Sequence, residues 1–374
     1  AISIQAQTGI SPNYGSTVIS NSTFDSNNVR ITTAVSNVYG SKRQDGGAIE
    51  ALGVFVVTTS TFTNNSAPRL GGAINSSNNY LGTSSYGSFA SAITHSTIER
   101  NSVTDTTGVG RGGGVSYNRT SGTYAGTILN FNRILNNTVG SNPNEPGRDM
   151  MLGGSATGSD KVDARFNWWG CSGDPRVAPS GTNNCNQSVS KVSPSADANV
   201  IPFAILTATA SPLQSKSAPA TSTITVATTK ALTPGNPDAI SSLTSVIDGN
   251  VGKNVSVSTS SSGATVSPGT VTLNDSASGT ATMNATSVGI KTGSASLDGV
   301  TVPFTFTVGP QLKFTATPSG TVAPGQNASY SIAAVDPADG TTVLTNQTFQ
   351  VNLTSSDSTA TLPTPVTVTN GVAT

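Results

Sequence analysis

Residues 56–65 read Val-Val-Thr-Thr-Ser-Thr-Phe-Thr-Asn-Asn, and the same pattern returns through the first half of the chain. Related stretches lie at residues 18–27, 92–101 and 128–137, and a degenerate copy runs from Val162 to Trp168. One apolar residue anchors each clear copy, at intervals of 38, 36 and 36 residues: Phe24, Phe62, Ile98 and Ile134. A nearly fixed period of this length indicates a repeat architecture in which each copy packs on the next.

The residue types of the repeat favour strands over helices. Arrays of paired helices have similar periods, but they need Leu, Ala, Glu and Lys at 3.6-residue spacing. Thr, Ser, Asn and Gly dominate this segment instead, and Thr and Val suit pleated strands. The sequence therefore predicts a parallel β-solenoid, in which equivalent residues of successive coils stack about 4.8 Å apart.

Asn occupies one position of every clear copy, three residues after the anchor: Asn27, Asn65, Asn101 and Asn137. Asn side chains stacked at a sharp corner can hydrogen-bond along the stack, so we predict a structural Asn ladder. Gly-Gly pairs at 46–47, 71–72 and 112–113 lie between the copies and permit positive φ where the next strand begins. The anchors Val57 and Phe62 are five residues apart, and this odd spacing predicts a bend between them.

The Phe-x-x-Asn element alternating with Gly-Gly-Ala-Ile resembles the repeats of chlamydial polymorphic outer-membrane proteins and related bacterial β-helix surface proteins. The first two copies match best, since the later ones carry Ile for Phe and Gly-Val for Ala-Ile. The repeats end at residues 166–171, Phe-Asn-Trp-Trp-Gly-Cys. This stretch resembles the closing motif of large secreted bacterial proteins in which a β-helix precedes immunoglobulin-like modules. The resemblance covers about residues 15 to 310 and implies a right-handed parallel β-helix followed by immunoglobulin-like β-sandwich domains.

Trp168 and Trp169, the two tryptophans of the chain, lie where the repeat stops. The end of a solenoid exposes a layer of core that must be covered, and indoles are large apolar groups suited to that task. We therefore predict that the two residues form a cap. A sugar-stacking platform is the alternative use of adjacent indoles.

Cys171 and Cys185, the two cysteines, flank a turn-rich loop that follows the repeats. After a β-helix of secreted type, we predict that they form a disulfide. Zinc would need four ligands from a chain with one His, and a redox pair is usually Cys-x-x-Cys.

The composition changes after the repeats, because every Arg lies between Arg30 and Arg176 and no Glu follows Glu145. Short alternating strand segments separated by turn residues then fit an immunoglobulin-like sandwich. We predict four segments from these features. They are a parallel β-helix with its C-terminal cap at 1–192, a linker at 193–206, one immunoglobulin-like domain at 207–309 and a second, incomplete one at 310–374. We also expect the native chain to continue beyond both ends.

Charge and length of apolar stretches exclude two classes of partner. The 18 Lys and Arg balance the 18 Asp and Glu, whereas nucleic-acid binding needs a basic surface. No apolar stretch approaches the roughly 20 residues that span a membrane. One His and three Glu leave little material for acid–base chemistry, so we predict no catalytic residues, no metal site and no cofactor.

A polysaccharide lyase or glycoside hydrolase is the alternative function, because β-helices host many such enzymes. Their sites need clustered carboxylates, often with Ca²⁺. The Asp residues of the first half occupy different repeat positions, although loops would be able to bring Asp45, Asp105 and Asp149 together. His95 shares its repeat position with Thr59 and Phe131, so we expect a surface or ladder residue there rather than a general base.

These features together predict a non-catalytic extracellular or cell-surface protein that displays a β-helix on immunoglobulin-like modules. Its role would be that of an adhesin, a stalk, or a filament or surface-layer component. The neutral, hydroxyl-rich composition fits contact with glycans or with other copies of the chain itself.

Overall fold

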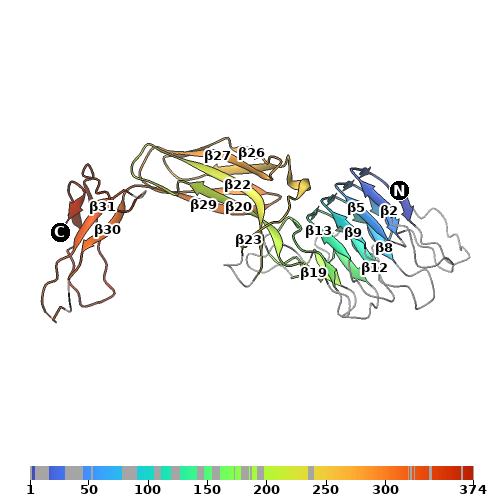
Figure 1. Ribbon diagram of the computed structural model, residues 1–374, viewed down its shortest axis with the longest axis horizontal. Coiled ribbons are helices and arrows are strands. Elements are labelled where there is room, and N and C mark those ends of the chain that lie inside the picture. Colours follow the sequence, from blue (N-terminus) through green and yellow to red (C-terminus); the bar gives the residue numbers. More distant parts are fainter. Residues whose placement is uncertain are drawn as a thin grey trace, which may run out of the picture.

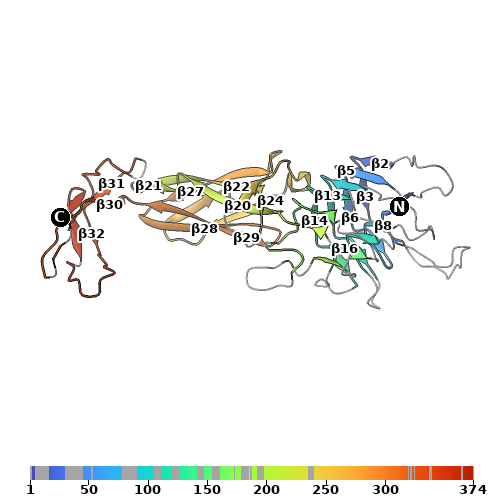
Figure 2. The ribbon, with the colours of Figure 1, turned by 60° about the horizontal axis from the view of Figure 1, so that its bottom comes forward.

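A computed structural model of the chain describes residues 2–4, 17–29, 45–51, 54–77, 91–104, 111–118, 127–140, 147–153, 161–171, 173–177, 185, 188–191, 198–234, 240–318, 320, 322–323, 325–336, 339–363 and 365–373. Within these ranges the regular structure is strands, apart from the 3₁₀ turn η1 (Asp248–Asn250). The prediction of an all-β chain is confirmed. Three units follow one another along the long axis, and the two views in Figures 1 and 2 agree on this order.

The first unit, called here the parallel-sheet unit, consists of four sheets whose strands all run parallel to their neighbours. Sheet I contains β2 (Thr17–Ser20), β5 (Phe55–Thr58), β9 (Ala92–Thr94), β13 (Ile128–Asn130), β17 (Val162–Asp163) and β19 (Ala198–Asn199). Sheet II contains β3 (Thr23–Asp25), β6 (Thr61–Thr63), β10 (Thr97–Glu99) and β14 (Arg133–Leu135). Sheet III contains β7 (Ser66–Ala67), β11 (Ser102–Val103) and β15 (Thr138–Val139). Sheet IV contains β1 (Ile2–Ile4), β4 (Ile49–Ala51), β8 (Ile74–Ser77), β12 (Val115–Asn118), β16 (Met150–Gly153) and β18 (Val189–Lys191).

The register of these sheets follows the sequence repeat. In sheet II, Phe62 is the Cα partner of both Phe24 and Ile98, and Ile98 is in turn the partner of Ile134. In the three coils that begin at β5, β9 and β13, the chain therefore passes once through sheets I, II, III and IV, and the predicted anchors are stacked neighbours. The prediction of a repeating parallel β architecture is confirmed.

A bend separates sheet I from sheet II in every coil, at a residue with positive φ. Four of these residues are Asn21, Thr59, His95 and Phe131, with φ of 48°, 49°, 52° and 57°. The bend predicted from the five-residue anchor spacing is therefore present. A glycine makes the turn into sheet IV: Gly71 has φ of 61°, and a Cβ there would overlap the Ile74 carbonyl.

The inward side chains of sheets I, II and IV form one apolar core, and sheet III contributes the buried side chains of Ala67, Val103 and Val139. In each sheet alternate residues face this core, because successive side chains of a strand point to opposite faces. Val57, Phe62 and Ile74 represent sheets I, II and IV of one coil, and all three are fully buried.

The second unit, called the two-sheet unit, packs two mainly antiparallel sheets face to face around a second core. One sheet contains β20 (Phe203–Ser211), β22 (Ala220–Leu232), β23 (Ile240–Ser242), β25 (Ala264–Ser267) and β27 (Ser278–Ala285). The other contains β21 (Gln214–Ser215), β24 (Asn254–Thr259), β26 (Thr270–Thr272), β28 (Gly289–Leu297) and β29 (Val300–Val308). Ile224 and Val226 from the first sheet, and Phe304 and Phe306 from the second, lie in this core.

The structure differs from the sequence prediction at the expected linker. Residues 198–199 are β19, the last strand of sheet I, and β20 begins at Phe203. Phe203 lies in the core of the parallel-sheet unit, whereas Ala210 at the other end of β20 lies in the core of the two-sheet unit. The apolar run 200–206 therefore continues from one core into the next.

The C-terminal unit contains two small sheets. The first contains β30 (Gln311–Ala316), β31 (Ser331–Val335) and β34 (Val372–Ala373). The second contains β32 (Phe349–Val351) and β33 (Val366–Val368). Ala334 and Val368 are the centre of its small core.

Candidate functional site

A row of Asn side chains runs along the parallel-sheet unit from coil to coil. The backbone N of Asn27 lies 3.0 Å from Oδ1 of Asn65, and its Nδ2 lies 2.8 Å from the same oxygen. Asn65 donates in the same way to Asn101, at 3.0 and 2.9 Å, and Asn101 donates to Asn137 at 2.9 Å twice. The structure thus brings together the four residues of the predicted ladder, and three of them are fully buried.

A buried carboxylate terminates this row. The backbone N and Nδ2 of Asn137 donate to Oδ1 of Asp149, at 3.2 and 2.8 Å. Burial raises the pKa of Asp149 to about 6, and the charge of Arg148 and the hydrogen bonds from Asn137 oppose this rise only in part. The last acceptor of the ladder is therefore a group that titrates between acid and neutral pH.

A second ladder at the bend between sheets I and II was missed from the sequence. Ser22 N donates to Ser60 Oγ at 3.2 Å, Ser60 N to Ser96 Oγ at 3.1 Å, and Ser96 N to Asn132 Oδ1 at 2.9 Å. Asn132 N continues to Asn167 Oδ1 at 2.9 Å. A signal was available, because these residues precede the apolar anchors by two positions in the clear copies.

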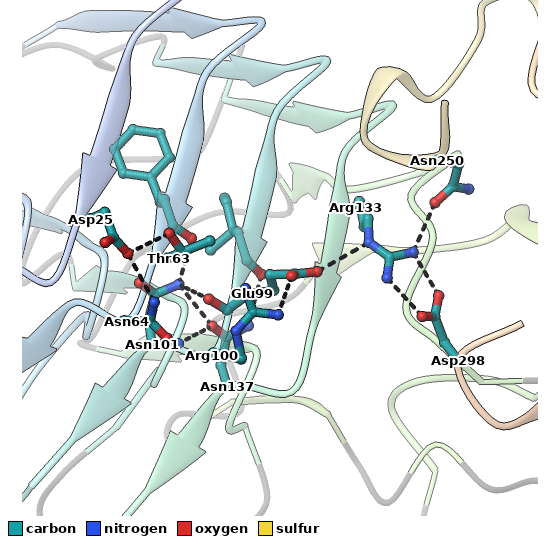
Figure 3. Close-up of polar contacts among 12 residues, drawn as sticks. Asp25, Thr63, Asn64, Glu99, Arg100, Asn101, Arg133, Asn137, Asn250 and Asp298 are labelled. Carbon is teal, nitrogen blue, oxygen red and sulfur yellow. Dashed lines mark hydrogen bonds and ion pairs between the residues drawn. The ribbon is translucent and has the colours of Figure 1, made fainter. Parts of the chain in front are cut away.

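The Arg133 cluster lies where the parallel-sheet unit meets the two-sheet unit (Figure 3). The cluster is defined by Arg133, Glu99, Asn250, Asp298 and Trp168. Arg133 Nη1 and Nη2 donate to the two carboxylate oxygens of Asp298, at 2.6 and 2.7 Å. Nε donates to Glu99 at 3.1 Å, and Nη1 also donates to Asn250 at 3.0 Å.

The side chains of this cluster are almost inaccessible to solvent. The side chains of Arg133, Glu99 and Asp298 are 4%, 5% and 15% exposed. Arg100 also pairs with Glu99 from the solvent side, so two cations and two carboxylates balance one another. A guanidinium bound bidentately to one carboxylate has a fixed orientation, and it therefore sets the geometry of the contact between the two units.

Trp168 and Trp169 are both buried, at 0% and 2% exposure, but they lie in different cores. Trp169 packs in the core of the parallel-sheet unit, and Trp168 packs in the core of the two-sheet unit. Trp168 Nε1 also donates to Asp298 at 2.8 Å. Neither indole offers an open face, so the sugar-stacking alternative does not fit the structure.

His95 lies in a column of rings at the bend between sheets I and II. Its ring stacks on Phe131, and Phe131 stacks on Phe166, with centroids 5.4 Å apart in both pairs. His95 Nδ1 lies 3.6 Å from a carboxylate oxygen of Asp248, in η1 of the two-sheet unit. The structure therefore places His95 in a ladder of side chains that leads to the contact between the units.

Cys171 and Cys185 form the predicted disulfide, with Cα atoms 4.9 Å apart. Both cysteines are buried in the core of the parallel-sheet unit. The bond lies within the last coil, between β17 of sheet I and β18 of sheet IV.

The carboxylates considered for catalysis are engaged elsewhere or lie outside the described residues. Asp45 pairs with Arg69 at 2.8 Å, and Asp149 terminates the Asn ladder. Asp105 lies outside the described residues. In the part of the chain that the structure describes, no three His, Cys, Asp or Glu side chains are grouped closely enough to hold a metal ion.

Two further findings concern partners and relatives. Among the described residues, no helix has the length and hydrophobicity needed to cross a membrane. Comparison of the chain with models of protein families and with curated proteins finds no match.

Proposed function

We propose that this chain is a non-catalytic extracellular surface protein, in which a right-handed parallel β-helix is displayed on immunoglobulin-like modules. In this proposal the β-helix is the parallel-sheet unit, and the two-sheet and C-terminal units are the modules. The repeat resembles that of chlamydial polymorphic outer-membrane proteins, and the disulfide between Cys171 and Cys185 fits an oxidising compartment.

The observation that carries the proposal is the Arg133 cluster. Bidentate pairing of Arg133 with Asp298 in a nearly dry contact holds the first unit in one orientation on the second. The units follow one another in a row, with the parallel-sheet unit at one end (Figure 1). A protein that presents a surface at a distance benefits from such a fixed joint, because a free joint would let the surface fold back.

The outward face of sheet II supports contact with neutral, hydroxyl-rich partners. Thr23, Thr61 and Thr97 form a column along this face, and Asp25 lies beside it. Hydrogen bonds from Thr63 and Asn64, at 2.7 and 2.8 Å, lower the pKa of Asp25 (Figure 3). Hydroxyl and carboxylate groups of this kind bind glycan hydroxyls by hydrogen bonds.

The test combines a binding assay with a product assay on the intact chain. The chain is attached by its C-terminal end to a surface, and binding of neutral and acidic polysaccharides is measured. The same polysaccharides are then incubated with the chain in solution, and new reducing ends and unsaturated uronate ends are quantified. We expect saturable binding of a neutral polysaccharide without product. Product formation above a boiled control would refute the proposal and support the lyase or hydrolase alternative.

A further inference from the structure

At three outward-facing positions of the repeat, the coil that contacts the two-sheet unit has residue types that differ from those of the earlier coils. Position 135 is Leu, whereas its stacked equivalents in earlier coils are polar: Asp25, Thr63 and Glu99. Position 133 is Arg where those coils have Thr, and position 131 is Phe where they have Asn, Thr or His. Leu135 lies in the core of the two-sheet unit, and Phe131 packs against that core.

Backbone contacts also continue through the joint. Phe166 N donates to Pro202 O at 2.7 Å, and Ala204 N donates to Asn167 O at 3.0 Å. Ala204 of β20 is thus bonded to the last coil, while the same strand pairs with β22 of the two-sheet unit from Phe203 to Ser211. Within residues 198–211, which the structure describes completely, no flexible spacer separates the two cores.

From these contacts we infer that the two-sheet unit is the end cap of the parallel-sheet unit, and that the Arg133 cluster is the latch that couples their folding. Without the two-sheet unit, Leu135 and Trp168 would expose apolar surface, and Arg133 would keep Glu99 but lose Asp298 and Asn250. The newly exposed apolar surface and the lost hydrogen bonds would destabilise the parallel-sheet unit on its own. The two units therefore unfold as one body rather than as independent modules. This inference goes beyond the proposed function and does not depend on it.

Asp298→Asn in the full chain tests the latch. Asp298 lies at the tip of the β28–β29 hairpin with φ of 54°, and Asn tolerates this conformation well, so the turn is kept. The variant removes the charge and places an amide NH₂ against Arg133 or Trp168. Asp336→Asn is the matched control, because Asp336 forms a more exposed ion pair with Lys216, at 3.1 Å, between the two-sheet and C-terminal units.

Hydrogen exchange measured by mass spectrometry and tryptophan fluorescence during urea unfolding provide the readouts. Both tryptophans lie at the joint, so their fluorescence reports it selectively. In the unmodified chain we expect residues 128–137 and 289–308 to lose protection in the same transition. In Asp298→Asn we expect at least tenfold faster exchange of residues 128–137 and two separate transitions, while Asp336→Asn behaves like the unmodified chain.

Two outcomes would overturn the inference. One is a single transition with unchanged exchange in Asp298→Asn, and the other is an equal effect of Asp298→Asn and Asp336→Asn. If Asp298→Asn does not fold, Trp168→Phe replaces it. That change keeps an aromatic ring in the core and deletes the bond from Nε1 to Asp298. We expect about threefold faster exchange of residues 128–137 in this variant, and unchanged exchange would again contradict the latch.

Discussion

Replacing Asn65 by Ala removes the central residue of the Asn ladder. The Asn65 side chain is fully buried and takes part in four hydrogen bonds. Its Oδ1 accepts from the backbone N and Nδ2 of Asn27, and its Nδ2 donates to Phe24 O at 2.9 Å and to Asn101 Oδ1 at 2.9 Å. The backbone bond from Asn65 N to Asn101 remains in the variant.

The size of the effect follows from which partners water can reach. Asn27 is partly exposed, so its two donors can be hydrated again after the substitution. The two bonds donated by Nδ2 lie on the buried side, and each contributes about 1 kcal/mol net. The lost packing adds about 1 kcal/mol more, so we expect a destabilisation of about 3 kcal/mol.

Urea unfolding followed by far-ultraviolet circular dichroism measures this difference. Asn199→Ala is the matched control, because Asn199 is an exposed Asn of the same unit, in β19 of sheet I, whereas Asn65 is buried at the corner between β6 and β7. We expect the control to change the free energy of unfolding by less than about 0.5 kcal/mol. Equal unfolding midpoints for the two variants would refute the reasoning that the ladder stabilises the coils.

Three further changes test other parts of the structure. Asp149 has a folded-state pKa of about 6 against 3.8 when unfolded, so the folded state binds its proton more tightly and loses stability as pH rises from 4 to 6. Urea unfolding at several pH values should show a loss of about 3 kcal/mol that is absent in Asp149→Asn; a parallel pH profile in the variant would contradict it. Ser96→Ala removes a nearly buried hydroxyl that accepts from Ser60 N and should cost about 1 to 2 kcal/mol by the same assay, whereas an unchanged midpoint would show that the second ladder is not stabilising. Reduction of Cys171–Cys185 opens a loop with a sequence separation of 14 and should lower stability by about 3 kcal/mol, and thiol alkylation before reduction should label neither cysteine.

The repeat made the parallel sheets predictable. Phe24, Phe62 and Ile98 are spaced nearly evenly in the sequence, and stacking is the one arrangement that buries all of them in a single core. The fixed Asn after each anchor indicated the ladder for the same reason. These features are local or periodic, so they can be recognised in a single sequence.

The joint between the units was not predictable in this way. Arg133 contacts Asn250 and Asp298, which lie 117 and 165 positions further along the chain. Nothing in the sequence relates these two residues to the repeat. The second ladder was missed because its position changes from Ser to Asn at residue 132. Residues 193–206 were interpreted as a linker around Pro194 and Pro202, although the run 200–206 connects two cores.

The stacking of coils also determines how much of the length of the molecule each unit contributes. A coil uses about 36 residues to advance about 4.8 Å along the stack, so the six strands of sheet I extend only about 24 Å. In the two-sheet unit the 13 residues of β22 alone extend about 43 Å at about 3.3 Å per residue. Added coils would thus lengthen the molecule slowly, by about 4.8 Å for each 36 residues. Added two-sheet units would lengthen it with fewer residues for each ångström, so the strands that run along the molecule supply most of its length.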